Sequence, residues 1–401
     1  MNSKTMLTPE REAKLIKLLQ EMIQQQSFSG EEEGVAKVIE KNLLALGYDS
    51  VTFDKYGNVI GCIKGNKPGK KILFDGHIDT VTIPEGTREK WTQDPFKAEI
   101  VDGKLYGRGT SDMKGPDATF MAACAFFAED CKKDFAGEIY VAGVVHEEIF
   151  EGVAAREISK NVKPDYVVIG ETSELNLKIG QRGRGEIVIE TFGKPAHSAN
   201  PHEGINAVKK MAKIILEIEK LVPPTGSLGL GILELTDIKS SPYPGSSVVP
   251  SGCRATYDRR LLVGETKESV LKPIQEVLDR LMAEDAELKA TVTYAYGKEK
   301  CYTGEFIEGE RFFPGWHYSE KDEFVQMAMK GLTEAGINYN VTQYSFCTNG
   351  SHYAGEAGIQ TIGFGPSTEI LAHKIDEHIE IEQLRKGAAG YYGILKAVFN
   401  K

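Results

Sequence analysis

The chain has 401 residues, and a hydrophobic content of 41% is sufficient for the cores of two or three domains, which excludes a disordered or fibrous protein. The 48 lysines and arginines and the 58 aspartates and glutamates give a formal net charge of −10. This acidity, without a basic stripe interleaved with aromatic residues, argues against nucleic acid as a partner. The N-terminus lacks the apolar core of a signal peptide, no run of about 18 apolar residues occurs, and none of the six cysteines forms a Cys-x-x-Cys pair. We therefore expect a cytoplasmic protein with reduced cysteines and no membrane partner.

Helical and extended patterns alternate over the first 180 residues. The Thr8-Pro9 pair predicts the cap and first turn of a helix with leucines at helical spacing. Ser29 and Glu32 form a capping-box pattern that predicts the start of a second helix, which Gly47 ends. There follow a hairpin over 51–64, buried strands at 72–74, 139–145 and 166–169, and helices near 115–130 and 150–160. This alternation predicts an α/β domain whose sheet is covered by helices on both faces.

The pattern changes after residue 180 and later returns. The patterns here predict strands at 186–192, 252–262 and 289–296 and helices at 203–221 and 267–282. Together these elements would form two helices on one antiparallel sheet. The first pattern resumes with a helix from about 321 to 335, a strand at 360–364 and a helix from 380 onward. The sequence therefore predicts a discontinuous α/β domain, 1–182 and 297–401, with a mixed, mostly parallel sheet flanked by helices. A smaller α+β domain at 183–296 interrupts it.

Imidazoles and carboxylates follow the predicted strands, at the end of the sheet where open α/β folds bind their ligands. Alone, His77 is also compatible with a lone turn histidine, and the pair Glu147-Glu148 with a solvated loop. Imidazoles or carboxylates occur at four strand ends, and this repetition favours a metal site. Neutral imidazole and carboxylate are ligands that suit zinc, manganese or cobalt. The candidates are His77, Asp79, Asp112, Glu147, Glu148, Glu171 and His373.

The order of these residues resembles that of the co-catalytic zinc amidohydrolases. That family includes acetylornithine deacetylase, succinyl-diaminopimelate desuccinylase, aminoacylase, glutamate carboxypeptidase and related dipeptidases. The resemblance covers nearly the whole chain and is closest to a bacterial subgroup labelled selenium-metabolism-linked hydrolases, whose label names no substrate. It rests on Asp75-Gly76-His77-Ile78-Asp79, the segment 107–115, Glu147-Glu148, Gly170-Glu171, Ala372-His373, Asp376-Glu377 and a lid-like signature at 193–207.

The resemblance implies two divalent metal ions, which we expect to be zinc, with manganese or cobalt as alternatives. Asp112 would bridge the two ions. His77 and Glu171 would hold one of them, and Glu148 and His373 would hold the other. A water molecule bridging the ions would be acidified by both charges.

The resemblance also assigns catalytic roles beside the metal ligands. Glu147 would be the general base, which takes a proton from the bridging water and returns it to the leaving amine. The alternative interpretation of Glu147 is a structural acid, which the resemblance disfavours. Asp79 would accept a hydrogen bond from His77 and so orient its ring. A cis peptide bond is expected after Asp112.

The inserted domain would be a lid that also forms the interface of a homodimer. His197 would reach a substrate in the partner subunit and stabilise the tetrahedral oxyanion, although a cap on the following helix is the alternative. Arg260 is the candidate to bind a substrate carboxylate through a bidentate pair, shared with backbone groups at Gly365. A surface or strand-pairing arginine is the other interpretation of Arg260. Ser247 stands where the family often has an asparagine that assists substrate binding.

Two further features depart from the family pattern. His146 stands where an aspartate usually precedes the paired glutamates, which changes the neighbour of the expected base. The segment 298–319 is long and irregular and is rich in aromatic residues, such as Phe306, Phe312, Phe313, Trp316 and Tyr318. Such a segment is typical of a lid over a pocket or of an interface, and both interpretations stay open.

Taken together, the sequence predicts an enzyme, a metallopeptidase-like hydrolase of C–N bonds in linear amides. The predicted substrates are small molecules, either an N-acyl amino acid, as for a deacetylase, or a dipeptide. An N-carbamoyl amino acid hydrolase on the same scaffold is the alternative. A catalytically silent binding protein is disfavoured, because that interpretation predicts loss of a ligand or of the base, and all are present.

Overall fold

The computed structural model of the protein describes residues 6–400, which form two units. The first unit comprises the chain up to Gln181, Lys298–Glu308 and the chain from His317 onward. The second comprises Arg182–Gly297 and Gly309–Trp316. The chain therefore passes between the units four times, and two of these passages fall within the aromatic-rich segment. No helix in the described part of the chain is long and apolar enough to cross a membrane.

The first unit is built on a mixed sheet of nine strands, which confirms the predicted fold class. These strands are β1 (Ser50–Phe53), β2 (Val59–Lys64), β3 (Lys67–His77), β6 (Ala136–Val144), β7 (Tyr166–Ile169), β8 (Leu177–Gln181), β18 (Trp316–His317), β19 (Val341–Tyr344) and β20 (Gln360–Gly363). β3 pairs in parallel with β6 and β7, and β7 pairs in parallel with β20. β1 and β2 form the predicted hairpin. Because β3, β6 and β7 run in one direction, their carboxyl ends meet at one edge of the sheet.

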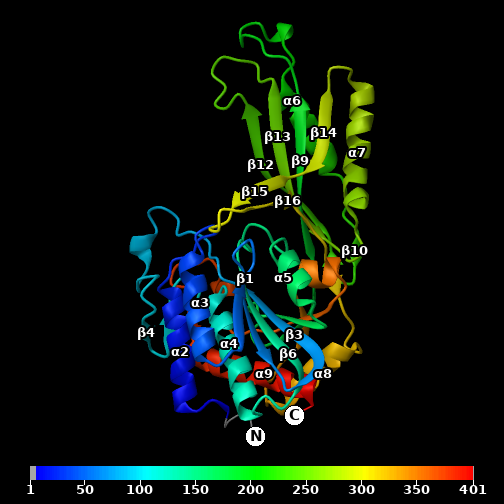
Figure 1. Cartoon of the computed structure of the whole chain (residues 1–401). Helices are drawn as coiled ribbons and strands as arrows, with labels where there is room; N and C mark the ends of the chain where they lie inside the picture. The colour runs from blue at the N-terminus through cyan, green and yellow to red at the C-terminus, as the bar shows by residue number, and fades with distance from the viewer. Residues whose placement is uncertain (1–5, 401) are drawn as a thin grey trace. The chain divides into compact units, whose positions relative to one another are not determined.

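Helices flank this sheet (Figure 1). They are α2 (Pro9–Ile23), α3 (Glu33–Ala45), α4 (Lys114–Asp130), α5 (Ala155–Val162), α8 (Glu323–Glu334) and α9 (Ile381–Phe399). α2, α4, α9 and α8 form a row in which each packs against the next. Thr8 caps α2 as predicted, because its side chain accepts a hydrogen bond from the backbone N–H of Arg11. The predicted capping box of α3 is wrong: Glu32 is its N-cap without a side-chain cap bond, and Ser29 donates elsewhere.

α8 and α9 approach each other through a pair of glycines. A Cβ atom on Gly331 would lie within 3.0 Å of the carbonyl oxygen of Gly393, and the reverse holds for a Cβ on Gly393. We expect Gly331→Ala to lower the free energy of unfolding by about 1–3 kcal/mol, because the two backbones must separate. Urea denaturation measures the change. Gly309→Ala is the control, since a Cβ there meets no atom within 4 Å, and equal effects of the two variants would contradict the prediction.

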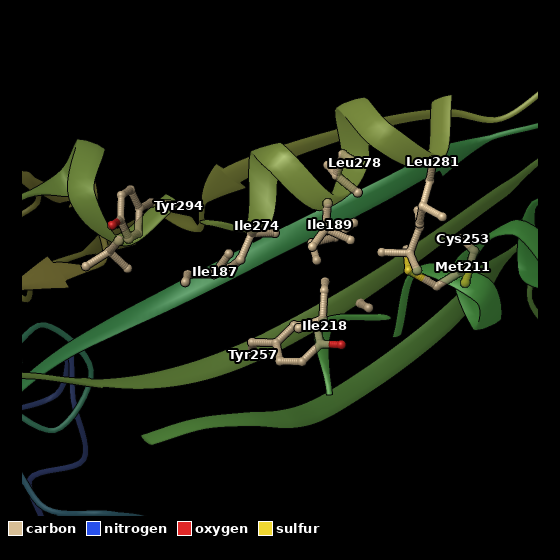
Figure 2. Close-up of a cluster of buried hydrophobic side chains, with 14 of the residues drawn as sticks. Ile187, Ile189, Met211, Ile218, Cys253, Tyr257, Ile274, Leu278, Leu281 and Tyr294 are labelled. Atoms are coloured by element: carbon tan, nitrogen blue, oxygen red, sulfur yellow. The ribbon is translucent and has the colours of Figure 1, made fainter. Parts of the chain in front are cut away.

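The second unit has four long antiparallel strands and two helices on one face of the sheet, and both helices and three of these strands were predicted. The elements are β9 (Gly183–Phe192), β12 (Ile232–Ser241), β13 (Gly252–Leu261), β14 (Lys289–Tyr294), α6 (Ala207–Ile218) and α7 (Lys267–Glu284). Figure 2 shows Ile274, Leu278 and Leu281 of α7 against Ile187 and Ile189 of β9. β12 is an edge strand in the order β12-β13-β9-β14 and is largely exposed, so its weak apolar pattern did not predict it.

The aromatic-rich segment is divided between the two units. β15 (Tyr296–Lys300) and β16 (Phe306–Glu310) form a hairpin, and its turn is held on the first unit. There the Tyr302 hydroxyl donates to the carbonyl of Gly57 at 2.8 Å, and the Thr303 hydroxyl donates to the carbonyl of Lys55 at 2.8 Å. In the second unit, β17 (Phe312–Phe313) pairs with β9 and both its rings are buried. Most of these aromatic side chains therefore have structural contacts within their own unit.

Candidate active site

Loops at the carboxyl edge of the sheet in the first unit carry the candidate residues. β3 and β6 end side by side, with His77 of β3 opposite Val144 of β6. Asp112 lies just before α4, and the peptide bond that joins it to Met113 is cis, as predicted. The other candidates follow strands or short helices: Glu147 and Glu148 after β6, Glu171 after β7, and His373 after η4 (Glu369–Leu371).

Asp112 lies between two imidazoles. Its Oδ1 is 2.9 Å from Nε2 of His77, and its Oδ2 is 3.0 Å from Nε2 of His373. Glu171 Oε1 lies 3.4 Å from Nε2 of His77, and Glu148 Oε1 lies 3.1 Å from Nε2 of His373. Ligand atoms around a tetrahedral zinc ion, each about 2.0–2.1 Å from the metal, are about 3.3 Å apart. The structure therefore brings together two groups of potential ligands that share Asp112.

The charges of this cluster fit two divalent cations. When ionised, Asp112, Glu147, Glu148 and Glu171 carry four negative charges, which two such cations balance. Within residues 6–400 these carboxylates have ion-pair contacts with histidines and with no lysine or arginine. In the same range Oε1 of Glu147 is buried and has no hydrogen-bond partner. Since buried carboxylates without a counter-charge are strongly unfavourable, the donor set fits cations.

Burial and crowding shift the pKa values of the cluster. Burial raises the pKa of Glu147 well above its usual value and that of Glu148 to about 7. Hydrogen bonds to Asp112 and Glu148 raise the pKa of His373 to about 10. Burial opposes the charge on Asp112, but contacts with His373 and His77 hold its pKa below the usual range. Protons and cations would therefore compete for the same atoms.

Asp79 contacts His77 differently from the prediction. Nδ1 of His77 lies 2.8 Å from the backbone carbonyl oxygen of Asp79, whereas the nearest carboxylate oxygen is 3.6 Å away. The carboxylate of Asp79 instead accepts hydrogen bonds from the backbone N–H groups of Glu147 at 3.0 Å and Glu148 at 3.2 Å. The backbone carbonyl of Asp79, and not its carboxylate as predicted, therefore orients the ring of His77. The carboxylate of Asp79 instead holds the loop that carries Glu147 and Glu148.

Glu377 holds the loop that leads to Asp112, a role that the sequence did not reveal. Its Oε1 accepts hydrogen bonds from the backbone N–H groups of Gly109, Ser111 and Asp112, at 3.0, 2.9 and 3.1 Å. Its Oε2 accepts from the Arg108 guanidinium at 2.6 Å, and both side chains are buried. The only sequence signal was the position of Glu377 at the end of the last shared motif.

Glu377→Ala is expected to lower the free energy of unfolding by about 3–5 kcal/mol, because Arg108 is left buried without its carboxylate. Urea denaturation followed by circular dichroism measures the change. Glu382→Ala is the matched control, since Glu382 is half exposed and its pairs with Arg385 and Lys386 on α9 are worth about 0–1 kcal/mol each. A Glu377→Ala protein as stable as Glu382→Ala would contradict this account of the loop.

A buried polar group lies behind His77. The carboxylate of Asp75 accepts hydrogen bonds from Asn349 Nδ2 at 2.9 Å and from the Tyr353 hydroxyl at 2.7 Å. Asn349 Oδ1 in turn accepts from the backbone N–H of Gly152 at 2.8 Å. Asn349 therefore joins the end of β3 to the loop that follows Glu148. No sequence pattern predicted this contact, because Asn349 is distant in the chain and lies outside every motif.

The candidates of the second unit lie on its surface. His197 is exposed and its Nδ1 accepts a hydrogen bond from the backbone N–H of Ala199. It caps no helix, because Asn206 is the N-cap of α6. Ser247 lies beside it, since its carbonyl accepts from the N–H of Ser198 at 3.0 Å. On β13, Nε of Arg260 lies 2.9 Å from Oδ1 of Asp258, and the side chain is 30% exposed.

Gly365 lies in the first unit, where its backbone groups are already bonded. Its N–H donates to the hydroxyl of Ser173 at 2.9 Å, and its carbonyl accepts from the N–H of Leu175 at 3.0 Å. The residue is buried. The expectation that Gly365 binds a substrate carboxylate is therefore not supported by its contacts, because the donor it would use has a partner.

Comparisons with known proteins identify the family of the chain. Residues 73–397 match the family described as Peptidase family M20/M25/M40. The Escherichia coli (strain K12) protein YgeY is 33% identical over 390 residues, which cover 96% of this chain and 94% of YgeY. Succinyl-diaminopimelate desuccinylase of Thioalkalivibrio sulfidiphilus is 27% identical over 404 residues, covering 94% and 97% of the two chains.

A solved structure shares the fold. It is that of Bacillus subtilis YXEP, described as a dinuclear metal binding peptidase from the M20 family. It superposes with a TM-score of 0.72 at 15% identity and covers 98% of this chain and 99% of its own. The family match covers residues 73–397, and the sequence similarity and the fold extend over almost the whole length. The chain belongs to peptidase family M20/M25/M40 and is a hydrolase.

Proposed function

We propose that the protein hydrolyses the C–N bond of a linear amide with the help of two divalent metal ions, most naturally zinc. The observation that carries this proposal is the pair of imidazole–carboxylate groups that share Asp112, with the buried Glu147 beside them. In this arrangement His77, Glu171 and one oxygen of Asp112 would hold one ion. His373, Glu148 and the other oxygen of Asp112 would hold the second.

Glu147 is the proposed general base. When bound, two divalent cations supply an acidified water and a polarised carbonyl at such a site. Glu147 takes a proton from the attacking water and returns it to the leaving amine. Its Oε2 is 3.9 Å from Nε2 of His77 and its Oε1 has no partner in the described chain, so it is both close to the ligands and free to accept. Asp79 and the loop that it holds keep Glu147 at this position.

The second unit is proposed to contribute to substrate binding as a lid. Arg260 would bind a substrate carboxylate, because its Nε contacts Asp258 while its two terminal nitrogens have no partner within residues 6–400 and the side chain is partly exposed. His197 would stabilise the oxyanion in a partner subunit, with Ser247 beside it. The homodimer would form through the second unit, whose edge strand β12 exposes Ile232 and Ile238.

The substrate is proposed to be an N-acyl amino acid or a dipeptide. The named relative that removes a succinyl group and the peptidases of the family support an amide between an acyl group and an amino acid. An N-carbamoyl amino acid is the second candidate, because the same site would cleave a ureido C–N bond.

A hydrolysis panel separates these candidates. Chelator-treated protein is reconstituted with zinc, manganese or cobalt and given acyl, dipeptidyl and carbamoyl amino acids, and free amine and ammonia are measured. The expected result is that acyl or dipeptidyl amino acids release free amine and no ammonia. Ammonia released with carbon dioxide from a carbamoyl substrate would support the second candidate instead. No hydrolysis of any substrate, together with no bound divalent ion, would support a silent binding protein.

A further inference from the structure

The turn between α2 and α3 is linked to the loop that carries Glu147 in two ways, directly at His146 and indirectly through Asp79. The sequence pattern assigned Ser29 and Glu32 to a helix cap. Instead, the Ser29 hydroxyl donates to Asp79, and Glu32 accepts from the backbone N–H of His146. We infer that Ser29 and Glu32 are positioning residues for Glu147, acting through Asp79 and through the backbone of His146. This inference rests on the proposed function, because it assumes that Glu147 is the base.

The first contact runs from Ser29 through Asp79. The Ser29 hydroxyl donates to Oδ2 of Asp79 at 2.7 Å. The same carboxylate accepts from the backbone N–H of Glu147 on Oδ1 and from that of Glu148 on Oδ2. Asp79 is fully buried, so the position of its carboxylate depends on these three donors. Removal of the Ser29 hydroxyl would leave the carboxylate with two donors, both from the loop that it must hold.

The second contact runs from Glu32 to His146, the residue before the base. Oε1 of the buried Glu32 accepts from the backbone N–H of His146 at 3.2 Å and from that of Gly30 at 2.9 Å. His146 has a φ of 57°, in the left-handed region that non-glycine residues rarely adopt. Both of its ring nitrogens are buried without a hydrogen-bond partner in the described chain. The backbone of His146, held by Glu32, therefore sets the turn that leads into Glu147.

These contacts matter because the Glu147 carboxylate has little support of its own. Its Oε1 has no hydrogen-bond partner in the part of the chain that the structure describes, so its location follows from the backbone that carries it. That backbone is held on both sides, at the N–H of His146 by Glu32 and at its own N–H by Asp79. Since small displacements of a base from its substrate reduce turnover strongly, loosening either contact should lower kcat.

Ser29→Ala tests the inference, with Ser29→Thr and Ser27→Ala as matched variants. Ser27 lies in the same turn and its hydroxyl also donates at 2.7 Å, but to the backbone carbonyl of Ile78. We expect Ser29→Ala to lower kcat about 10- to 100-fold, the usual effect of losing a group that orients a metal-site residue. KM and zinc content should stay at the wild-type values. Ser29→Thr should restore kcat to within about threefold because it retains the hydroxyl, and Ser27→Ala should lower kcat far less.

These variants test the inference only if wild-type protein hydrolyses a substrate and Glu147→Ala does not. Failure of the proposed function is thereby distinguished from failure of the inference about Ser29 and Glu32. Equal losses in Ser29→Ala and Ser27→Ala, or a loss in proportion to zinc content, would overturn the inference.

His146 gives a second test that does not involve a hydroxyl. His146→Gly should keep kcat within about fivefold, because glycine adopts the left-handed conformation without strain. His146→Val should lose most activity, since a β-branched residue is strongly disfavoured there. A higher kcat in His146→Val than in His146→Gly would also overturn the inference.

Discussion

Replacing Glu147 by alanine is expected to lower kcat by about 10²–10⁴-fold, the range typical of losing a general acid or base. Glu147 is the buried carboxylate whose Oε1 has no hydrogen-bond partner in the described residues, and the proposed arrangement does not need it to hold either cation. The variant should therefore keep the zinc content of wild type. Turnover at saturating substrate and zinc content after gel filtration measure the two quantities.

Glu148→Ala is the matched control, because it removes the adjacent glutamate from the same loop. Oε1 of Glu148 lies 3.1 Å from Nε2 of His373, so this variant should lose zinc as well as activity. The comparison is informative because Glu147, His77 and Glu171 also offer atoms within 4.8 Å of one another, as a metal ligand set would. Appreciable kcat in Glu147→Ala would remove Glu147 as the base, and equal zinc loss in both variants would make it a ligand.

Asp112→Ala is expected to abolish activity and to lose both metal ions. Each oxygen of Asp112 faces a different imidazole, His77 on one side and His373 on the other, so its removal affects both groups of ligands. Zinc content and hydrolysis rate are measured on protein whose circular dichroism shows the wild-type fold.

His373→Ala is the control for the shared role of Asp112. Among the candidate ligands, His373 contacts only Asp112 and Glu148. Its loss should therefore affect one ion, while the ligands of the other ion, His77, Glu171 and Asp112, all remain. A variant of Asp112 that binds as much zinc as His373→Ala would contradict a bridging position.

Most of the candidate metal ligands could be predicted because they follow short apolar strands in the sequence, whereas Asp112 precedes α4. The rule that ligands gather at the carboxyl ends of parallel strands places His77 and Glu171 together without any knowledge of distances. The resemblance then ordered the residues into two groups, and the geometry of Asp112 agrees with that order. Most of the inserted α+β unit was equally accessible, since its helices and buried strands have clear periods, but the exposed edge strand β12 was not.

The residues that hold the ligand loops could not be predicted, because their partners are distant in the chain. Ser29 and Glu32 match a capping box by spacing, yet a buried carboxylate of Asp79 and a backbone N–H of His146 compete for them. Local spacing contains no information on such tertiary partners. For the same reason Glu377 and Asn349 were seen only once the fold brought them to their loops.

Zinc titration of chelator-treated protein tests the central claim most directly, with release of free amine from the best substrate of the panel as the signal. The account predicts no hydrolysis by the stripped protein and recovery of activity that ends at two zinc ions per chain. Full activity in the stripped protein, or hydrolysis that does not depend on added metal, would contradict it.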